Sequence, residues 1–426
     1  MAYPQAGAAL APNTQAYVRN HNSAQVLNCL RLEGPLSRAE LSRRTGLNRS
    51  TVSSIVAALI ENHLVRETEL QKGEVGRPGM ALEIDPDGGC AVGIEIGVGI
   101  LSVLLADLVA RPLWERRVPV DPALGQEAII GQAEALVRAA LDVAEAQGRR
   151  VFGIGVGIHG LVDVASGELR FAPNLHWRHL PLRRQWQARF ALPVFVENDA
   201  NAAALGEYYF GIARQVQDFI YLSTTAVGLG GGIVANGQLY RGGSGYAGEI
   251  GHVTLDPHGE LCGCGRRGCW ETFLDTRRII SHVRVALAES RHLAGPGDGA
   301  ARASGPLAAM AAGDPEGLTF EQVVAAARAG DGLALDALRH VADALAAGIA
   351  NLANIFNPRM VVLGGYFSPL ADLLIPMMQE PLRAHTLDEP MEILSVVPSA
   401  HPVGVACPIG AVALVLDDVM RAPTLA

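Results

Sequence analysis

The chain has 426 residues, of which 49% are hydrophobic and 18% are charged, and its formal net charge is −9. At about 150 residues per domain, this length predicts about three compact units with sizeable cores. The acidic balance excludes a protein that coats nucleic acid over its whole surface.

The longest apolar run covers residues 91–110, and it contains Glu95, Asp107 and three glycines. Charges and glycines at this density argue against a membrane-spanning helix. The chain starts without a secretory pattern, and its cysteines suit a reducing compartment. We therefore expect a cytoplasmic protein.

Positive charge is concentrated near the start of the chain. Residues 1–66 contain seven Arg and three Glu, which leaves −13 for the remaining residues. Local positive charge is sufficient to attract DNA phosphates, although arginine enrichment can also arise by chance. We expect a flexible N-terminus over residues 1–19 and a DNA-binding domain over residues 20–87, called the head below.

Two helices open the head. Asn22 or Ser23 can cap a first helix that continues towards Gly34, because either side chain accepts a hydrogen bond from a first-turn amide. The sequence from Ser37 to Glu40 then predicts a capping box at the start of a second helix. This helix ends at Gly46, and short turns between helices are typical of a helix-turn-helix.

A third helix begins after its N-cap, Asn48. Its apolar residues recur at helical spacing, so one face is buried and the opposite face is exposed. The exposed residues are predicted to contact the major groove of DNA: Arg49, Ser50, Thr51, Ser53 and Ser54.

Residues 64–69 and 80–84 are predicted to form two strands, and the glycines and proline of residues 71–79 suit a hairpin between them. The head is then a winged helix-turn-helix. Lys72 and Arg77 on this hairpin are candidates for phosphate or minor-groove contacts. The alternative is a three-helix module that contacts only proteins.

The rest of the chain alternates strands with helices, which predicts an α/β architecture. The expected strands are residues 91–96, 100–107, 113–118, 151–157, 194–197, 219–223 and 360–363. The expected helices are residues 126–147, 200–209 and about 335–356. Residues 291–314 are rich in Ala, Gly, Pro and Ser, and they are expected to form a mobile surface insertion.

The stretch from Gly248 to Glu271 contains two His, three Cys and three Glu. One imidazole and three thiolates complete a tetrahedral zinc shell, with no position left for a catalytic water. The thiolates come from Cys262, Cys264 and Cys269, and the imidazole from His252 or His258. Free or disulfide-bonded thiols are the alternative, but two cysteines one residue apart make a poor disulfide. The sequence predicts a structural zinc site.

Several motifs together resemble the repressor, open reading frame and kinase (ROK) family of sugar-binding proteins. They are the metal-binding stretch, GIEIGVG near residue 95, ENDANAAALGE at 197–207, GLGGGIVANG at 228–237 and NPRMVVLGG at 357–365. The resemblance implies an actin-like, hexokinase-like pair of α/β lobes over residues 88–426, with a sugar in the cleft. Lobe one would comprise about 88–197 plus the C-terminal helix, and lobe two about 198–408.

The resemblance also implies functional residues. It selects His252 over His258 as the metal ligand. It places the backbone of Gly160 and five polar side chains around the sugar hydroxyls. These side chains belong to Asn198, Asp199, Glu249, His252 and Glu271. Such groups supply both acceptors and donors, as a polyol requires.

With the head included, the chain resembles the family's transcriptional regulators, such as xylose and N-acetylglucosamine repressors. The family's kinases carry Asp-x-Gly-Gly-Thr where this chain has Glu95-Ile-Gly-Val-Gly99, and Gly-Thr where it has Ala226-Val227. Both phosphate loops are therefore expected to be degenerate. We expect a homodimeric or homotetrameric repressor that a sugar releases from operator DNA, with an ATP-dependent sugar kinase, using Asp199 as base, as the alternative.

Overall fold

The computed structural model describes residues 15–69, 80–225, 228–292, 305–311 and 315–423. Its contacts divide the chain into two compact units. The first comprises Met1–Gln215, Gly243–Gly245 and Gly404–Ala426, and the second comprises Val216–Gly242 and Tyr246–Val403. Among the described residues, no helix is both long and apolar enough to cross a membrane.

The head belongs to the first unit. Its elements are α1 (Gln15–Glu33), β1 (Leu36–Ser37), α2 (Arg38–Thr45), α3 (Arg49–Glu61), β2 (Val65–Glu69) and β3 (Met80–Ile84). The strands form a sheet in the order β1-β3-β2, with β2 and β3 antiparallel. Three helices followed by this hairpin confirm the winged helix-turn-helix that the sequence predicts.

Helix α1 starts earlier than expected. It begins at Gln15, so the predicted caps Asn22 and Ser23 lie inside the helix, and residues 15–19 are helical rather than flexible. The sequence contains no Gly or Pro between Gln15 and Glu33, and nothing therefore stops the helix near Asn22.

The other predicted caps of the head are confirmed. Ser37 and Glu40 form a capping box, in which Glu40 Oε2 accepts from the Ser37 amide at 2.8 Å. Gly46 ends α2 in the left-handed conformation, with φ of 71°. Asn48 Oδ1 accepts from the Thr51 amide at 2.8 Å and caps α3.

A five-stranded sheet in the order β11-β7-β4-β5-β6 forms the centre of the first unit. Its strands are β4 (Cys90–Gly97), β5 (Ile100–Asp107), β6 (Pro112–Pro119), β7 (Val151–Ile158) and β11 (Val194–Asn198). Strands β4, β7 and β11 are parallel, whereas β5 and β6 run antiparallel to them.

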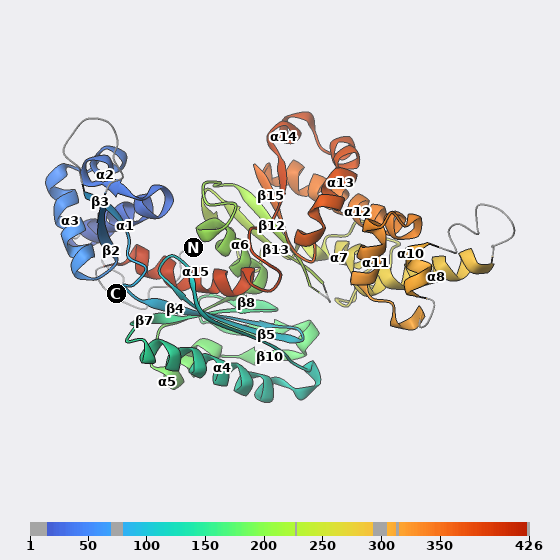
Figure 1. Ribbon diagram of the computed structural model, residues 1–426, viewed down its shortest axis with the longest axis horizontal. Helices are drawn as coiled ribbons and strands as arrows, with labels where there is room; N and C mark the ends of the chain where they lie inside the picture. The colour runs from blue at the N-terminus through green and yellow to red at the C-terminus, as the bar shows by residue number, and fades with distance from the viewer. Residues whose placement is uncertain (1–14, 70–79, 226–227, 293–304, 312–314, 424–426) are drawn as a thin grey trace. The chain divides into compact units, whose positions relative to one another are not determined.

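Helices cover this sheet on both faces. They are α4 (Gln126–Ala146), α5 (Leu182–Phe190), α6 (Asp199–Phe210) and α15 (Ala406–Arg421), together with the short turns Pro122–Leu124 and Pro173–Leu175. A small antiparallel sheet of β8 (Leu161–Asp163), β9 (Glu168–Ala172) and β10 (Trp177–Leu180) follows β7. Figure 1 shows α15 and α6 on the face of the sheet opposite α4 and α5.

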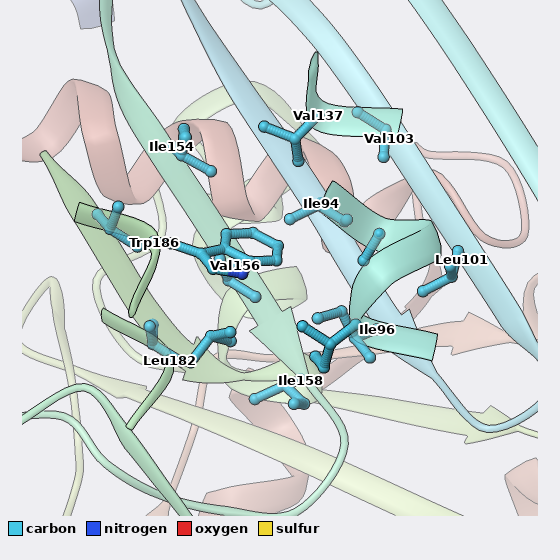
Figure 2. Close-up of a cluster of buried hydrophobic side chains, with 14 of the residues drawn as sticks. Ile94, Ile96, Leu101, Val103, Val137, Ile154, Val156, Ile158, Leu182 and Trp186 are labelled. Carbon is cyan, nitrogen blue, oxygen red and sulfur yellow. The ribbon is translucent and has the colours of Figure 1, made fainter. Parts of the chain in front are cut away.

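The core on the α4–α5 face is built from branched aliphatic side chains of the central strands. Figure 2 shows Ile94 of β4, Ile154 and Val156 of β7, Val137 of α4 and Trp186 of α5 pointing into one cluster. Alternate residues of a strand share a face, so this packing fixes the face on which each side chain of the strand lies.

The second unit repeats the arrangement of the first. Its sheet has the order β14-β13-β12-β15-β16, from β12 (Phe219–Thr225), β13 (Gly228–Ala235), β14 (Gln238–Leu239), β15 (Met360–Gly365) and β16 (Ser395–Pro398). In both sheets the first three strands form an antiparallel meander, and the next two add in parallel beside the first. This duplication confirms the expected pair of α/β lobes.

Helices of the second unit are α7 (Trp270–Leu274), α8 (Thr276–His292), α10 (Pro306–Met310), α11 (Phe320–Arg328), α12 (Gly332–Phe356), α13 (Ala371–His385) and α14 (Asp388–Ile393). Single turns are Ile250–His252, Pro315–Gly317 and Ser368–Leu370.

Two expectations about boundaries need correction. Leu307 of α10 is fully buried, so the described part of residues 291–314 is not all a surface insertion; an apolar helix face packs on α8 and α11 there. The units divide after Gln215, later than the expected boundary at residue 198, because α6 packs on α15 in the first unit.

Candidate functional site

Helix α3 carries the predicted DNA-contacting face of the head. Val52, Ile55, Val56 and Leu59 are buried. The opposite face holds the predicted contact residues, of which Arg49, Ser50, Ser53 and Ser54 are exposed and Thr51 is half-buried. Lys72 and Arg77, the candidates on the hairpin, lie outside the described residues.

A group of polar residues gathers at the carboxyl ends of three adjacent parallel strands in the first unit. Asn198 ends β11, His159 follows β7, and Glu95 lies near the end of β4. The carboxyl ends of parallel strands meet at one edge of the sheet, which is where open α/β sheets bind ligands.

Asn198 joins this edge to the start of α6. Its Oδ1 accepts from the amides of Ala200 and Asn201 at 3.0 and 3.1 Å, so Asn198, not Asp199, is the N-cap. Its Nδ2 donates to Gly160 O at 3.1 Å. Gly160 has φ of 129°, and a Cβ there would lie 2.6 Å from Phe171 O, so only glycine fits.

Asp199 has a partner that the motifs do not identify. His159 Nδ1 lies 3.1 Å from Asp199 Oδ2, and His159 Nε2 lies 3.1 Å from Asn174 Nδ2. Burial raises the pKa of Asp199, but the charge and hydrogen bond of His159 outweigh it and hold the pKa below its ordinary value. The sequence could have indicated His159 as a site residue, because it directly follows a buried parallel strand.

Glu95 is the carboxyl of this group whose pKa is raised. Its Oε2 is buried and has no hydrogen-bond partner among the described residues. Burial, reinforced by the negative charge of Asp199, raises the pKa of Glu95 to about 7. Glu95 is therefore partly neutral near neutral pH, whereas Asp199 is ionised.

The predicted metal ligands converge in the second unit. The ligand atoms of His252, Cys262, Cys264 and Cys269 all lie within 4.8 Å of one another. Cys264 Sγ lies 3.7 Å from Cys269 Sγ, and Cys262 Sγ lies 3.7 Å from His252 Nδ1. Zinc bonds of about 2.3 Å to sulfur and about 2.0 Å to nitrogen give tetrahedral edges of about 3.5–3.8 Å. Both 3.7 Å separations match these edges, and one imidazole with three thiols is a donor set that zinc takes.

The disulfide alternative for this loop does not fit the structure. The Cys264–Cys269 separation of 3.7 Å is much longer than a disulfide bond, and all six cysteines are free. His258 is exposed and outside the ligand group, in agreement with the choice of His252. Cys90 and Cys407 are buried as small hydrophobes, and Cys29 is half-buried.

Two carboxylates flank His252, the histidine of this ligand group. His252 Nδ1 faces the cysteines and lies 3.5 Å from Glu271 Oε1, whereas His252 Nε2 lies 4.0 Å from Glu249 Oε2. Glu271 is in the first turn of α7, which buried Trp270 anchors against Gly348 of α12. The structure thus brings Gly160, Asn198 and Asp199 together in the first unit and Glu249, His252 and Glu271 together in the second.

The kinase-like loops are only partly described. Gly97 ends β4, and Val98 and Gly99 form the turn into β5. A Cβ on Gly97 would lie 2.9 Å from Ile100 Cγ2, so a side chain at this position would displace Ile100. Ala226 and Val227 of the second loop lie outside the described residues.

Comparisons with known proteins cover both parts of the chain. Residues 91–418 match the family model described as the ROK family, and residues 19–66 match one described as winged helix-turn-helix DNA-binding. A putative xylose repressor of Caldicellulosiruptor sp. (strain Rt8B.4) is 33% identical over 96% of this chain and 98% of its own length. A glucokinase of Streptomyces coelicolor is 35% identical over 69% of this chain and 86% of its own length.

A solved structure of a ROK family transcriptional regulator, a homologue of the E. coli MLC protein, covers 96% of this chain and 98% of its own. Its TM-score is 0.79 at 28% identity. Both full-length matches include the head, whereas the glucokinase match covers a smaller share. The chain belongs to the ROK family and carries a winged helix-turn-helix ahead of its ROK region.

Proposed function

We propose that this chain is a sugar-responsive transcriptional repressor, which binds operator DNA through its head and releases it when a monosaccharide binds. One observation carries the proposal: likeness to a putative xylose repressor extends over 96% of the chain, including a head whose α3 exposes arginine and hydroxyl groups. A module that contacted only proteins would not need this polar face.

The DNA contacts are proposed on α3 and on the hairpin. They are Arg49, Ser50, Thr51, Ser53, Ser54, Lys72 and Arg77. Arginine reads guanine edges with two hydrogen bonds, and small hydroxyls contact bases or phosphates. A homodimer or homotetramer would present paired heads to half-sites about one DNA turn apart.

Two groups of residues are proposed to bind sugar hydroxyls, and each belongs to one unit. Asn198, Asp199 and the Gly160 backbone supply donors and acceptors in the first unit. Glu249, His252 and Glu271 supply them in the second, where His252 Nε2 faces away from the cysteines. A polyol needs this mixture of acceptors and donors.

Zinc is the proposed metal, held by His252, Cys262, Cys264 and Cys269. Four protein ligands leave no open coordination position, so the ion's contribution is to fix the loop and the orientation of the His252 ring. The fit of the sulfur and nitrogen spacings to a tetrahedron supports this assignment.

An ATP-dependent sugar kinase is the alternative, and the 35% identity to a glucokinase is the observation that favours it. Against it, Val98 stands where the kinases have glycine, and Gly99 lacks their threonine hydroxyl. The low pKa of Asp199, a consequence of His159, makes its carboxylate a weaker general base. We therefore propose a regulator that binds sugar without phosphorylating it.

Operator binding and sugar phosphorylation provide the test. DNA selected from a random library by the full chain is titrated by fluorescence anisotropy with and without D-xylose, D-glucose or N-acetylglucosamine. We expect one sugar to weaken DNA binding by about 5–150-fold, the usual range of allosteric coupling. Operator affinity that no sugar changes, or rapid formation of sugar phosphate from ATP–Mg²⁺, would overturn the proposal.

A further inference from the structure

Arg31 is a buried arginine at the C-terminal end of α1, on the side of the head that contacts the ROK region. It is 7% exposed. Its Nη1 makes long hydrogen bonds to Tyr208 O and Tyr209 O, at 3.5 and 3.4 Å. Its guanidinium carbon lies 4.3 Å from the ring centroid of Tyr209 and 5.5 Å from that of Tyr208. Both tyrosines belong to the last turn of α6.

These contacts cap a helix across a domain boundary. Carbonyls in the last turn of a helix have no partner within the helix, and a cation placed there also meets the negative end of the helix dipole. Arg31 supplies that cation to α6. Arg214, just after α6, donates in return to Arg31 O in the last turn of α1. Arg31 of α1 thus caps α6, and Arg214, which follows α6, caps α1.

The same tyrosine connects this contact to α15. The Tyr209 hydroxyl donates to Asp417 Oδ1, and Asp417 Oδ2 lies 2.8 Å from Arg421 Nε. Burial, together with the charge of Asp417, raises the pKa of Tyr209, so its hydroxyl remains a donor.

Helices α6 and α15 lie side by side (Figure 1) with their backbones in contact. A Cβ on Gly410 of α15 would lie 1.7 Å from Ala202 O of α6. Packing this close leaves no room for one helix to shift without the other. A movement of α6 therefore reaches the head both through Arg31 and through α15.

The opposite end of α6 holds the proposed sugar contacts of the first unit. Asn198 caps the helix and Asp199 is its first residue. The helix has 12 residues, which span about 18 Å at about 1.5 Å per residue. A hydrogen-bonded helix of this length behaves as a rigid rod, so a shift at Asn198 appears at Tyr209.

We propose that Arg31 is the positioning residue through which sugar binding controls the head: it fastens the head to the C-terminal end of the helix whose N-terminal end holds the sugar. This inference rests on the proposed function. Sugar that moves α6 changes the position of α1, and α1 carries α2 and α3 with it, because all three helices share one buried core with α15.

The experiment measures coupling rather than either affinity alone. Wild type, Arg31→Ala and Arg66→Ala are compared as full chains; Arg66→Ala removes the same charge from the head but pairs with Glu83, away from α6. Calorimetry gives the affinity for D-xylose, D-glucose and N-acetylglucosamine, and anisotropy gives the affinity for the selected DNA with and without the sugar that binds.

We expect Arg31→Ala to bind the sugar within about threefold of wild type. Arg31 contacts the C-terminal end of α6, whereas the proposed sugar contact Asn198 lies at its N-terminal end. Arg31→Ala removes one of the two connections between α6 and the head, so adding sugar should change its operator affinity clearly less than that of wild type and Arg66→Ala, which keep the full effect of about 5–150-fold. An undiminished sugar effect in Arg31→Ala overturns the inference and leaves the proposed function standing. A wild type whose DNA binding ignores every sugar overturns both.

Hydrogen exchange on the DNA-free wild type provides a second measurement, which also decides the matter if Arg31→Ala does not fold. We expect the bound sugar to change the exchange of peptides covering residues 28–34 and 205–214, where the two arginine caps lie. Sugar binding that alters exchange near Asn198 but at neither of these segments overturns the inference.

Discussion

His159 Nδ1 lies 3.1 Å from Asp199 Oδ2, while the other nitrogen of the ring, Nε2, lies 3.1 Å from Asn174 Nδ2. Nδ1 donates to the carboxylate, and the positive charge of the protonated ring adds to the effect of this hydrogen bond on Asp199. This arrangement stabilises Asp199 as an anion. It suits a carboxylate that holds a hydroxyl group better than one that removes the hydroxyl proton.

Replacing His159 with Ala should shift the pH dependence of sugar binding. Burial alone raises the pKa of Asp199, and His159 is the largest influence that lowers it. Only the ionised carboxylate is a pure acceptor, so affinity falls as pH drops through the pKa of Asp199. Without His159 the pKa of Asp199 rises, so we expect the sugar affinity of the variant to start falling at a higher pH than that of wild type. Calorimetry between pH 4 and 8 measures this.

The matched control is His179→Ala, because His179 is an exposed histidine of the same unit that pairs with Glu168 instead. It should keep the wild-type profile. Superimposable pH profiles for His159→Ala and wild type would show that His159 does not set the state of Asp199.

Replacing Glu95 with Gln should flatten the pH dependence of stability. The folded pKa of Glu95 is about 7, above its ordinary value of 4.5, so the folded state binds the proton more tightly. Its contribution is therefore fully present below about pH 4.5 and is lost as pH rises through about 7. Because one pKa unit corresponds to about 1.4 kcal/mol, the difference is on the order of 3–4 kcal/mol.

Urea unfolding between pH 5 and 8 measures this effect. Wild type should lose stability across that range relative to Glu95→Gln, whose side chain cannot ionise. Glu115→Gln is the control, since Glu115 is an exposed residue of β6 and should leave the wild-type slope unchanged. Equal slopes for wild type and Glu95→Gln would mean that Glu95 stays ionised in the folded chain.

Local patterns of the sequence were sufficient for most of the fold. Residues 100–107 are predicted as a strand and form β5 with the same bounds, and the caps at Ser37 and Asn48 follow from side chains that act on nearby amides. Helix α6 was predicted over residues 200–209 and forms over Asp199–Phe210, one residue longer at each end. The assignment of α6 to the first unit could not be predicted from local patterns, because it depends on packing against α15, roughly 200 residues later along the chain.

The proposed metal site and the proposed sugar contacts differ in how far the sequence indicates them. All four metal ligands lie within one loop, so their spacing in sequence already indicated their convergence. His159, in contrast, meets Asp199 only because β7 and β11 are neighbours in the sheet. Arg31 meets Tyr209 only through tertiary packing. Contacts of this kind leave no periodicity in the sequence.

Replacing His252 with Ala should remove the metal and weaken sugar binding together. The variant leaves three thiolates, and a structural zinc site contributes its binding energy to the stability of the loop. We expect elemental analysis to find about one zinc ion per wild-type chain and little in the variant, with a lower melting temperature. Loss of the His252 ring should also weaken sugar affinity by about tenfold or more, since metal ligands and their partners typically carry effects of about 10–100-fold.

His258→Ala is the control for this experiment. His258 lies in the same loop, but its side chain is exposed and outside the ligand group, so zinc and sugar affinity should both be retained. Full zinc content in His252→Ala would contradict the ligand assignment. Zinc loss with unchanged sugar affinity would contradict only the contact between His252 and the sugar.

Replacing Arg49 with Ala should weaken operator binding without changing sugar affinity. Arg49 is the first residue of α3 and is exposed, and residues near the start of a recognition helix are the ones that reach base edges or phosphates. A base contact is worth about 1–3 kcal/mol, so we expect a loss of about 5–150-fold in anisotropy titrations at fixed salt. Arg189→Ala, which removes an exposed arginine of α5 paired with Glu134, should bind DNA like wild type.

The salt dependence of the Arg49→Ala titration separates two kinds of contact. If Arg49 binds a phosphate, the slope of log affinity against log salt should decrease by about 1, and all DNA sequences should be affected equally. If Arg49 reads a base, the slope should change little and discrimination should relax at one operator position. Wild-type affinity in Arg49→Ala, together with wild-type affinity in Ser53→Ala, would exclude this face of α3 from the DNA interface and would favour a head that contacts protein.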